Sequence, residues 1–111
     1  MRCIVERLYK KAVSTSTEDL VANLRASEDK IRWTRLVAFD ATNATTYTEV
    51  GVRQGTSLYP AAREGAPSAH DHVATDVPLE LPGDWVPYAR FAGATAGDDL
   101  YLVAFGYYVD A

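Results

Sequence analysis

The segment from Leu100 to Val109 constrains the fold most, because it is apolar or aromatic at nearly every position. Successive side chains of an extended strand point to opposite faces of the sheet. One face would carry Tyr101, Val103, Phe105, Tyr107 and Val109, and the other Leu100, Leu102, Ala104 and Gly106. A strand that is apolar on both faces lies in the centre of a sheet or is covered by a neighbouring subunit, and we predict such a strand here.

The composition of the chain also favours strands. Val, Ile, Thr, Tyr, Phe and Trp account for 35 of the 111 residues, and these side chains fit a pleated sheet. Five prolines and seven glycines separate the alternating segments at intervals typical of a sandwich or barrel. We predict one all-β domain over residues 1–111, an antiparallel β-sandwich of Greek-key or jelly-roll type with seven or eight strands.

The other predicted strands are Cys3–Val13, Lys30–Thr42, Thr46–Gln54, Thr56–Ala62, Val77–Leu81 and Trp85–Ala92. Lys30–Thr42 and Thr46–Gln54 flank a short polar turn, which predicts a hairpin. Val77–Leu81 contains Pro78, which cannot donate to a ladder, and it is therefore predicted to be an edge strand. Arg63–His72 shows no periodicity and is predicted to be an exposed loop.

Residues 18–27 leave two alternatives open. Ser16 precedes Glu18 and Asp19 as a helix cap would, which predicts a helix with Leu20 on its apolar face. The same residues alternate as in a half-buried strand. We prefer the strand, because the segments on either side are predicted strands.

Aromatic side chains fall into two groups by their place in the alternation. The predicted core includes Ile31, Trp33, Val37, Phe39, Phe91 and Phe105. Tyrosines on the opposite faces are expected at a protein interface, because tyrosine has a large apolar body and a polar tip. The predicted partner interface consists of Tyr47, Tyr59, Trp85, Tyr88, Arg90 and Tyr108.

Charge and termini exclude several classes of protein. The net charge of -4 disfavours a nucleic-acid binder, which usually presents a basic stripe. Residues 1–55 hold nine basic and seven acidic side chains, whereas residues 56–111 hold two and eight, so a basic N-terminal half would suit docking onto an acidic neighbour. The N-terminal segment is charged, so we predict no signal peptide. No apolar run is long enough for a transmembrane helix, so we predict no membrane span. Cys3 is the single cysteine, which fits a reducing cytoplasm.

Two clusters of polar residues resemble parts of enzyme sites. His70, His72 and Asp76 approach the spacing of the first metal-binding motif of the cupins, but the chain has no third histidine and prolines interrupt the segment. We predict a solvated loop there and no metal. Asp84, Asp98 and Asp99 precede strands, where aspartate favours turns. No nucleophile elbow or phosphate-binding loop occurs, so we predict no catalytic residue, no cofactor and no enzymatic activity.

Five segments together resemble a known class of protein. They are Asp29–Asp40, Val50–Gly55 with Tyr59, Asp76–Asp84, Gly93–Leu100, and Gly106-Tyr107. Their order is similar to that in small β-sandwich virion proteins of tailed bacteriophages, which are head decorations or tail-associated modules. The resemblance implies a non-enzymatic structural protein that binds capsid or tail proteins as a symmetric homo-oligomer, with a trimer favoured. It also implies synthesis in the host cytoplasm and a final place in the virion.

Two other functions remain open at this point. Exposed aromatics also stack on sugar rings, so Trp85 or Tyr88 would serve a carbohydrate-binding module of a tail fibre. A cupin-like metal-binding protein would use His70, His72 and Asp76.

Overall fold

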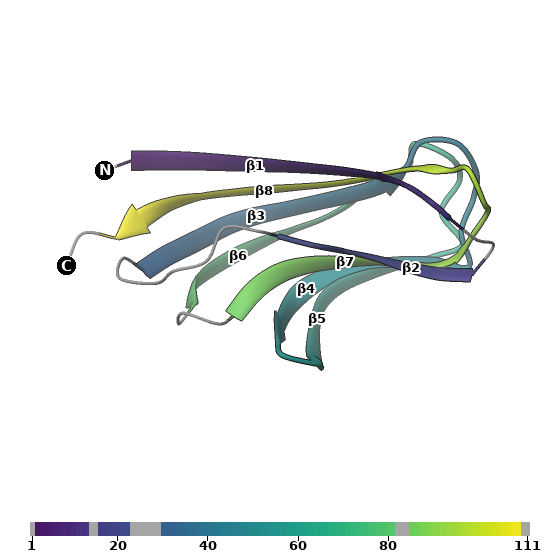
Figure 1. Ribbon diagram of the computed structural model, residues 1–111. Coiled ribbons are helices and arrows are strands. Elements are labelled where there is room, and N and C mark those ends of the chain that lie inside the picture. The colour runs from purple at the N-terminus through teal and green to yellow at the C-terminus, as the bar shows by residue number, and fades with distance from the viewer. Residues whose placement is uncertain (1, 14–15, 23–29, 82–84, 110–111) are drawn as a thin grey trace.

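The computed structural model describes residues 2–13, 16–22, 30–81 and 85–109. The strands are β1 (Arg2–Lys11), β2 (Ser16–Val21), β3 (Lys30–Asp40), β4 (Tyr47–Gln54), β5 (Ser57–Gly65), β6 (Val73–Leu81), β7 (Trp85–Ala94) and β8 (Asp99–Val109). They form two four-stranded antiparallel sheets (Figure 1). The first sheet has the order β1-β8-β3-β6, and the second has the order β2-β7-β4-β5.

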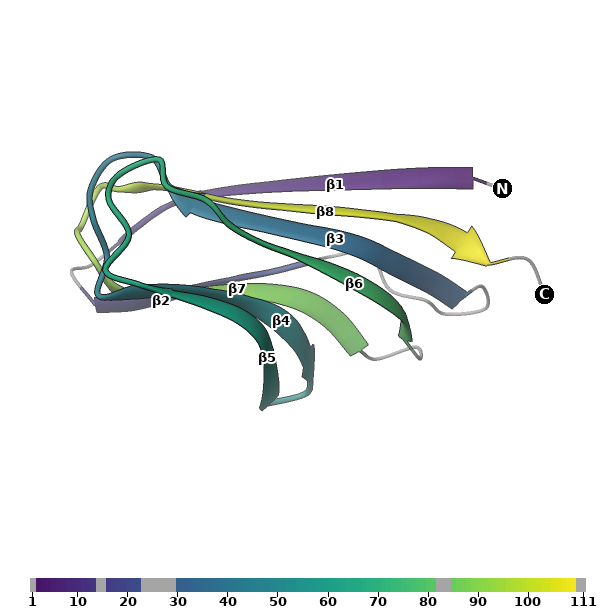
Figure 2. The ribbon, with the colours of Figure 1, turned by 180° about the vertical axis from the view of Figure 1, so that it is seen from behind.

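The chain passes from one sheet to the other at every connection except the one between β4 and β5. This is the topology of a jelly roll, and it confirms the predicted all-β antiparallel sandwich. The second sheet curves away from the first toward the β4–β5 turn (Figures 1 and 2). The described residues contain no helix that is long and apolar enough to cross a membrane.

The prediction of a central final strand is confirmed. β8 lies between β1 and β3, with Val5 of β1 and Arg35 of β3 both opposite Phe105. Its inward side chains Leu100, Leu102 and Ala104 are fully buried between the sheets. β6 is an edge strand, as its proline predicted.

The predicted core face of β3 was wrong in its second half. The ladder register shifts between Trp33 and Arg35, where a β-bulge adds one residue to the strand. One extra residue moves all following side chains to the opposite face. The core side chains after Trp33 are therefore Leu36 and Ala38, while Val37 and Phe39 point outward. The prediction of Phe105 in the core was also wrong, because this residue of β8 lies opposite Arg35 and shares the outward face.

The predicted hairpin between Lys30–Thr42 and Thr46–Gln54 was also wrong. β3 and β4 belong to different sheets, and β4 instead forms its hairpin with β5. β5 continues to Gly65, so the loop predicted over Arg63–His72 is shorter than expected. Alternation along the sequence identifies a strand but carries no information about its partner.

The strand alternative for residues 18–27 is confirmed as far as Val21, where β2 ends. The remainder of that segment lies mostly outside the described residues. The same holds for Asp84, which was predicted to lie in a turn.

A contact between adjacent strands limits side-chain size in the core. Trp33 of β3 lies opposite Gly106 of β8. A Cβ at position 106 would lie 2.6 Å from the carbonyl oxygen of Arg32 and 3.1 Å from Cε3 of Trp33. The carbonyl group of Arg32 and the indole of Trp33 therefore together occupy the space that a side chain at Gly106 would need.

We expect Gly106→Ala to lower the free energy of unfolding by about 1–3 kcal/mol, because overpacking forces backbone or rotamer shifts. Gly65→Ala is the matched control, because no atom lies within 4 Å of a Cβ at that position. Urea unfolding followed by tryptophan fluorescence measures both variants. Equal stability of the two variants would contradict the proposed packing limit.

Candidate functional site

Four charged side chains form a row across the outer face of the second sheet. The ladder places Asp19 of β2 opposite Arg90 of β7, Arg90 opposite Glu49 of β4, and Glu49 opposite Arg63 of β5. Acids and bases alternate along the row, one from each strand. Opposite charges on directly facing positions stabilise a sheet.

Each carboxylate of this row is held by charge-assisted hydrogen bonds. Arg90 donates Nε and Nη2 to the two oxygens of Asp19, at 2.8 and 3.0 Å. Arg63 donates Nε and Nη2 to Oε1 of Glu49, at 2.9 and 2.6 Å. The hydroxyl of Tyr88 donates to Oε2 of Glu49 at 2.7 Å. Glu49 is only 2% exposed, and both of its oxygens are used, so it is a satisfied buried charge.

The donors of this network stay protonated. Burial and the hydrogen bond to Glu49 raise the pKa of Tyr88. The hydrogen bond to Asp19 raises the pKa of Arg90, and the bond to Glu49 raises that of Arg63. The guanidinium carbon of Arg63 also lies 4.0 Å from the centre of the Tyr47 ring. The network thus holds side chains in place and contains no free base.

Three of the six predicted interface residues meet at this network: Tyr47, Tyr88 and Arg90. The expectation that Tyr88 is exposed was wrong, because its exposed fraction is 0%. It lies on the outward face, but long charged side chains cover their neighbours there. A buried tyrosine keeps its hydroxyl paired, and Glu49 is the acceptor.

Tyr59 and Trp85 form a separate aromatic pair. Their rings are stacked with centres 5.1 Å apart and planes at 24°. Tyr59 is 48% exposed, whereas Trp85 is partly buried against the core. Tyr108, the remaining predicted interface residue, lies on β8 and also packs against the core. The six residues therefore do not form one continuous surface.

The cupin-like residues make other contacts. The backbone N–H of His70 donates to the carbonyl oxygen of Asp40 at 2.9 Å, and His72 packs on Phe39 with ring centres 4.6 Å apart. Asp76 accepts a hydrogen bond from Arg35 at 2.8 Å. Within the described residues, no three His, Cys, Asp or Glu side chains are grouped as metal ligands.

Two buried carboxyl groups, Asp40 and Asp98, meet where three loops converge. Oδ1 of Asp40 accepts the N–H groups of Thr42 and Asn43, at 2.9 and 3.1 Å. Asp98 accepts the side chain of Asn43 at 2.6 Å and the N–H of Thr95 at 2.9 Å. Oδ2 of Asp40 accepts no hydrogen bond from any described residue.

The pair is arranged to share a proton. Burial and the hydrogen bond with Asp98 raise the pKa of Asp40 to about 6. Burial alone would raise the pKa of Asp98, but bonds from Asp40, Asn43 and Thr95 outweigh burial and lower it. When Asp40 is protonated, its unpaired oxygen becomes a donor to Asp98. These carboxyl groups organise loops, as predicted for Asp98.

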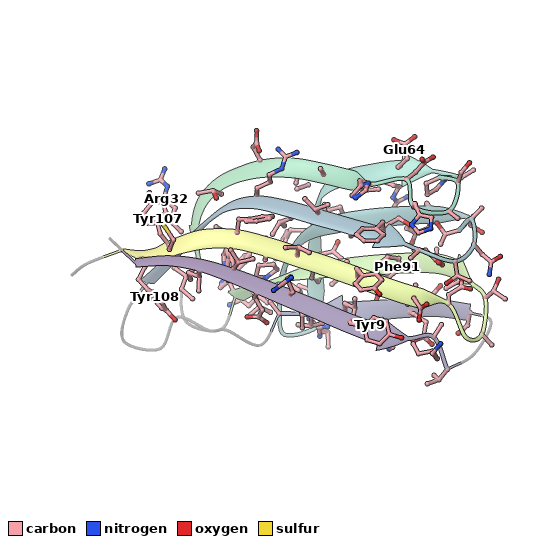
Figure 3. The ribbon with its side chains drawn as sticks, turned by 90° about the horizontal axis from the view of Figure 1, so that it is seen from above. Tyr9, Arg32, Glu64, Phe91, Tyr107 and Tyr108 are labelled. Carbon is pink, nitrogen blue, oxygen red and sulfur yellow. The ribbon has the colours of Figure 1, made fainter. Side chains whose placement is uncertain are left out.

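The outer face of the first sheet has an apolar centre, of which the sequence predicted the part that β8 contributes and not the part from β1 and β3. Its members are Val5, Tyr9, Val37, Phe39, Tyr101, Val103 and Phe105. Val5 and Tyr9 are 55% and 53% exposed. A continuous row of rings crosses the face, with centre distances of 5.1 Å from Tyr9 to Tyr101 and 5.0 Å from Tyr101 to Phe39. In Figure 3 this face is toward the viewer, with no strand over it.

Comparison with known proteins identifies the fold and no sequence family. No protein-family model matches this chain, and no curated protein matches it in sequence. The fold is similar to that of the mitogen from Yersinia pseudotuberculosis, at 10% identity and a TM-score of 0.55, covering 97% of this chain and 89% of that chain. A protein of the disulfide-linked endospore appendages of Bacillus matches at 6% identity and a TM-score of 0.51, covering 98% and 90%.

A chain of tomato aspermy virus matches at 8% identity and a TM-score of 0.44, covering 98% of this chain and 79% of that chain. The mitogen and the appendage protein, which match at TM-scores above 0.5, are proteins of different kinds. At these identities the similarity concerns the fold alone.

We expect the Asp40–Asp98 pair to make stability depend on pH in an unusual direction. The native state binds the Asp40 proton more tightly than the unfolded state, because the folded pKa is raised to about 6. This contribution is fully present below the unfolded pKa and is lost as the pH rises through about 6. Its size is roughly 2–3 kcal/mol. The pKa of Asp98 is lowered, so its titration affects stability only at a pH well below 6.

Urea unfolding of the parent and of Asp40→Asn at about pH 4.5 and about pH 7.5 tests this expectation. The variant lacks the titrating group, so the parent should gain stability relative to it on acidification. A difference between the two proteins that stays constant over this range would contradict the shared proton.

Proposed function

We propose that this chain is a non-enzymatic structural protein of a tailed bacteriophage virion. It binds a repeating capsid or tail surface as a symmetric homo-oligomer, made in the host cytoplasm and incorporated into the particle. It requires neither a metal nor a cofactor in this role.

The outer face of the first sheet is the observation that carries the proposal. Aromatic and aliphatic side chains lie there in an unbroken row over β1, β8 and β3, and two of them are more than half exposed. A contiguous apolar patch of this kind marks an interaction site in a soluble protein. On the outer face of the second sheet, the acids Asp19 and Glu49 are paired with Arg90 and Arg63 of neighbouring strands.

The fold is compatible with this role. The appendage protein of Bacillus, which shares the fold at a TM-score of 0.51, belongs to disulfide-linked pili. The segments that resemble phage virion proteins narrow the proposal to a virion. The exposed Tyr59 and the Tyr47–Arg63 contact offer further contact points for the particle.

We expect the purified chain to bind particles of its own phage that lack it, at a fixed ratio to the capsid or tail subunits. Sedimentation of particles with increasing amounts of chain measures this ratio, and electron microscopy locates the added density. Heat-unfolded chain is the control for non-specific adsorption. Binding that fails to saturate, or no binding, would contradict the proposed virion role.

Carbohydrate binding is a second candidate, favoured by the stacked pair of Tyr59 and Trp85. Tyr59 is 48% exposed, and its ring stacks on the ring of Trp85. The pair would therefore give a sugar a rigid aromatic platform. Tyr88, the other residue considered for this role, is buried and is not available to a glycan.

For this candidate we expect the chain to bind a glycan on an array, and we expect Tyr59→Ala to weaken that binding about tenfold or more. A tenfold loss corresponds to about 1.4 kcal/mol, which is typical for removal of a contact residue. Tyr9→Ala is the matched control, because Tyr9 is similarly exposed but lies on the other sheet. An array without any bound glycan would remove this candidate.

A further inference from the structure

The two edge strands of the first sheet carry opposite charge. Among the described side chains, those of β1 that point outward include the basic Arg7 and Lys11, and those of β6 include the acidic Asp76. The two strands between them, β8 and β3, carry the apolar patch of the outer face, and β3 also places Arg35 next to Asp76. The face therefore runs from a basic edge through an apolar centre to an acidic edge. A surface of this kind is complementary to a second copy of itself.

We propose that two copies of this chain pack face to face through the outer faces of their first sheets, about a twofold axis parallel to the strands and between β8 and β3. This inference rests on the proposed function, in which the chain acts as an oligomer. A half turn about such an axis reverses the strand order β1-β8-β3-β6. It lays β8 over β3 of the second copy and β1 over its β6.

The apolar centres match in this arrangement, because rotation about an axis along the strands keeps the level of each residue. Val103 and Val37 are cross-strand partners, so Val103 of each copy faces Val37 of the other. Tyr101 and Phe39 are also partners and would extend the aromatic row across the interface. At the next level, Phe105 would face Arg35 of the second copy, a contact of guanidinium and ring.

The charged edges also meet twice. Val37 lies at the level of Ala74 on β6, so Arg7 of one copy reaches the level of Ala74 in the other. Asp76 is the next outward position on β6, about 7 Å along the strand, which is within the reach of an arginine. Asp76 is 76% exposed and already accepts a hydrogen bond from Arg35. Each interface would therefore join Arg7 to an existing Arg35–Asp76 pair.

The face is large enough for a stable dimer. Four strands about 4.8 Å apart and about ten residues long, at about 3.3 Å per residue, cover roughly 600 Å² on each copy. Two copies would bury about 1,200 Å² in total, at the lower end of specific protein interfaces. The resemblance to phage proteins favoured a trimer, whereas this face pairs copies in twos.

We expect sedimentation equilibrium of the purified chain at about 100 µM to give the mass of two chains. Val103→Glu places a charge at the centre of the face, and we expect it to weaken self-association at least about tenfold. Arg7→Glu should weaken it several-fold, and Asp76→Arg in the same chain should restore part of the loss by exchanging the two charges.

Arg53→Glu is the matched control, because it makes the same charge change on the second sheet. Circular dichroism verifies that each variant is folded. A monomer or a trimer would overturn the twofold arrangement, and so would a dimer that neither Val103→Glu nor Arg7→Glu weakens. Sedimentation with particles is measured separately. If the chain binds particles but forms no dimer, the proposed virion role stands and the dimer interface is wrong. If it forms the dimer but binds no particle, the interface stands and the virion role is wrong.

Discussion

The contact between Trp33 and Gly106 organises the first sheet. The indole occupies the space above Gly106, and this directly opposed pair fixes which faces of β3 and β8 point inward. One residue later the bulge begins, and the hydroxyl of Thr34 donates to the carbonyl oxygen of Phe105 at 3.2 Å. The extra residue of β3 is thereby held to β8 by its side chain. β3 keeps Trp33 in the core while its remaining half changes face.

The apolar outer face of the first sheet follows from this bulge. Without the added residue, the alternation that buries Trp33 would also bury Val37 and Phe39, and Leu36 would point outward. With it, Leu36 and Ala38 fill the narrow space between the sheets, and the larger Phe39 stacks on Tyr101 outside. β8 supplies the other half of the face because both of its sides are apolar. Core packing and the exposed face thus have one structural cause.

The sequence predicted what depends on local alternation and missed what depends on strand order. The sandwich, the central β8 and the edge position of β6 follow from alternation and from Pro78. The only sign of the bulge at Thr34 in the sequence is Arg35, which interrupts the predicted apolar face between Trp33 and Val37. The bulge reverses the assignment of Phe39. The Glu49 network was missed for a different reason. A single acid between Tyr47 and Arg53 in the sequence meets Arg63 and Arg90 only after β4 is placed between β5 and β7.

The charge difference between the two halves of the sequence becomes a difference across one sheet. β1 belongs to the basic half and β6 to the acidic half, and the jelly-roll order places them at opposite edges of the first sheet. On the second sheet the opposite charges lie on neighbouring strands and neutralise one another within the chain. On the first sheet β8 and β3 lie between the two edges, so Arg7 of β1 and Asp76 of β6 are too distant to pair in the same molecule. Within the chain Lys10 pairs with Glu18, Lys11 with Asp99, and Asp76 with Arg35. A second copy with the strand order reversed would bring Arg7 to the Arg35–Asp76 pair, and this is the charged contact of the proposed dimer.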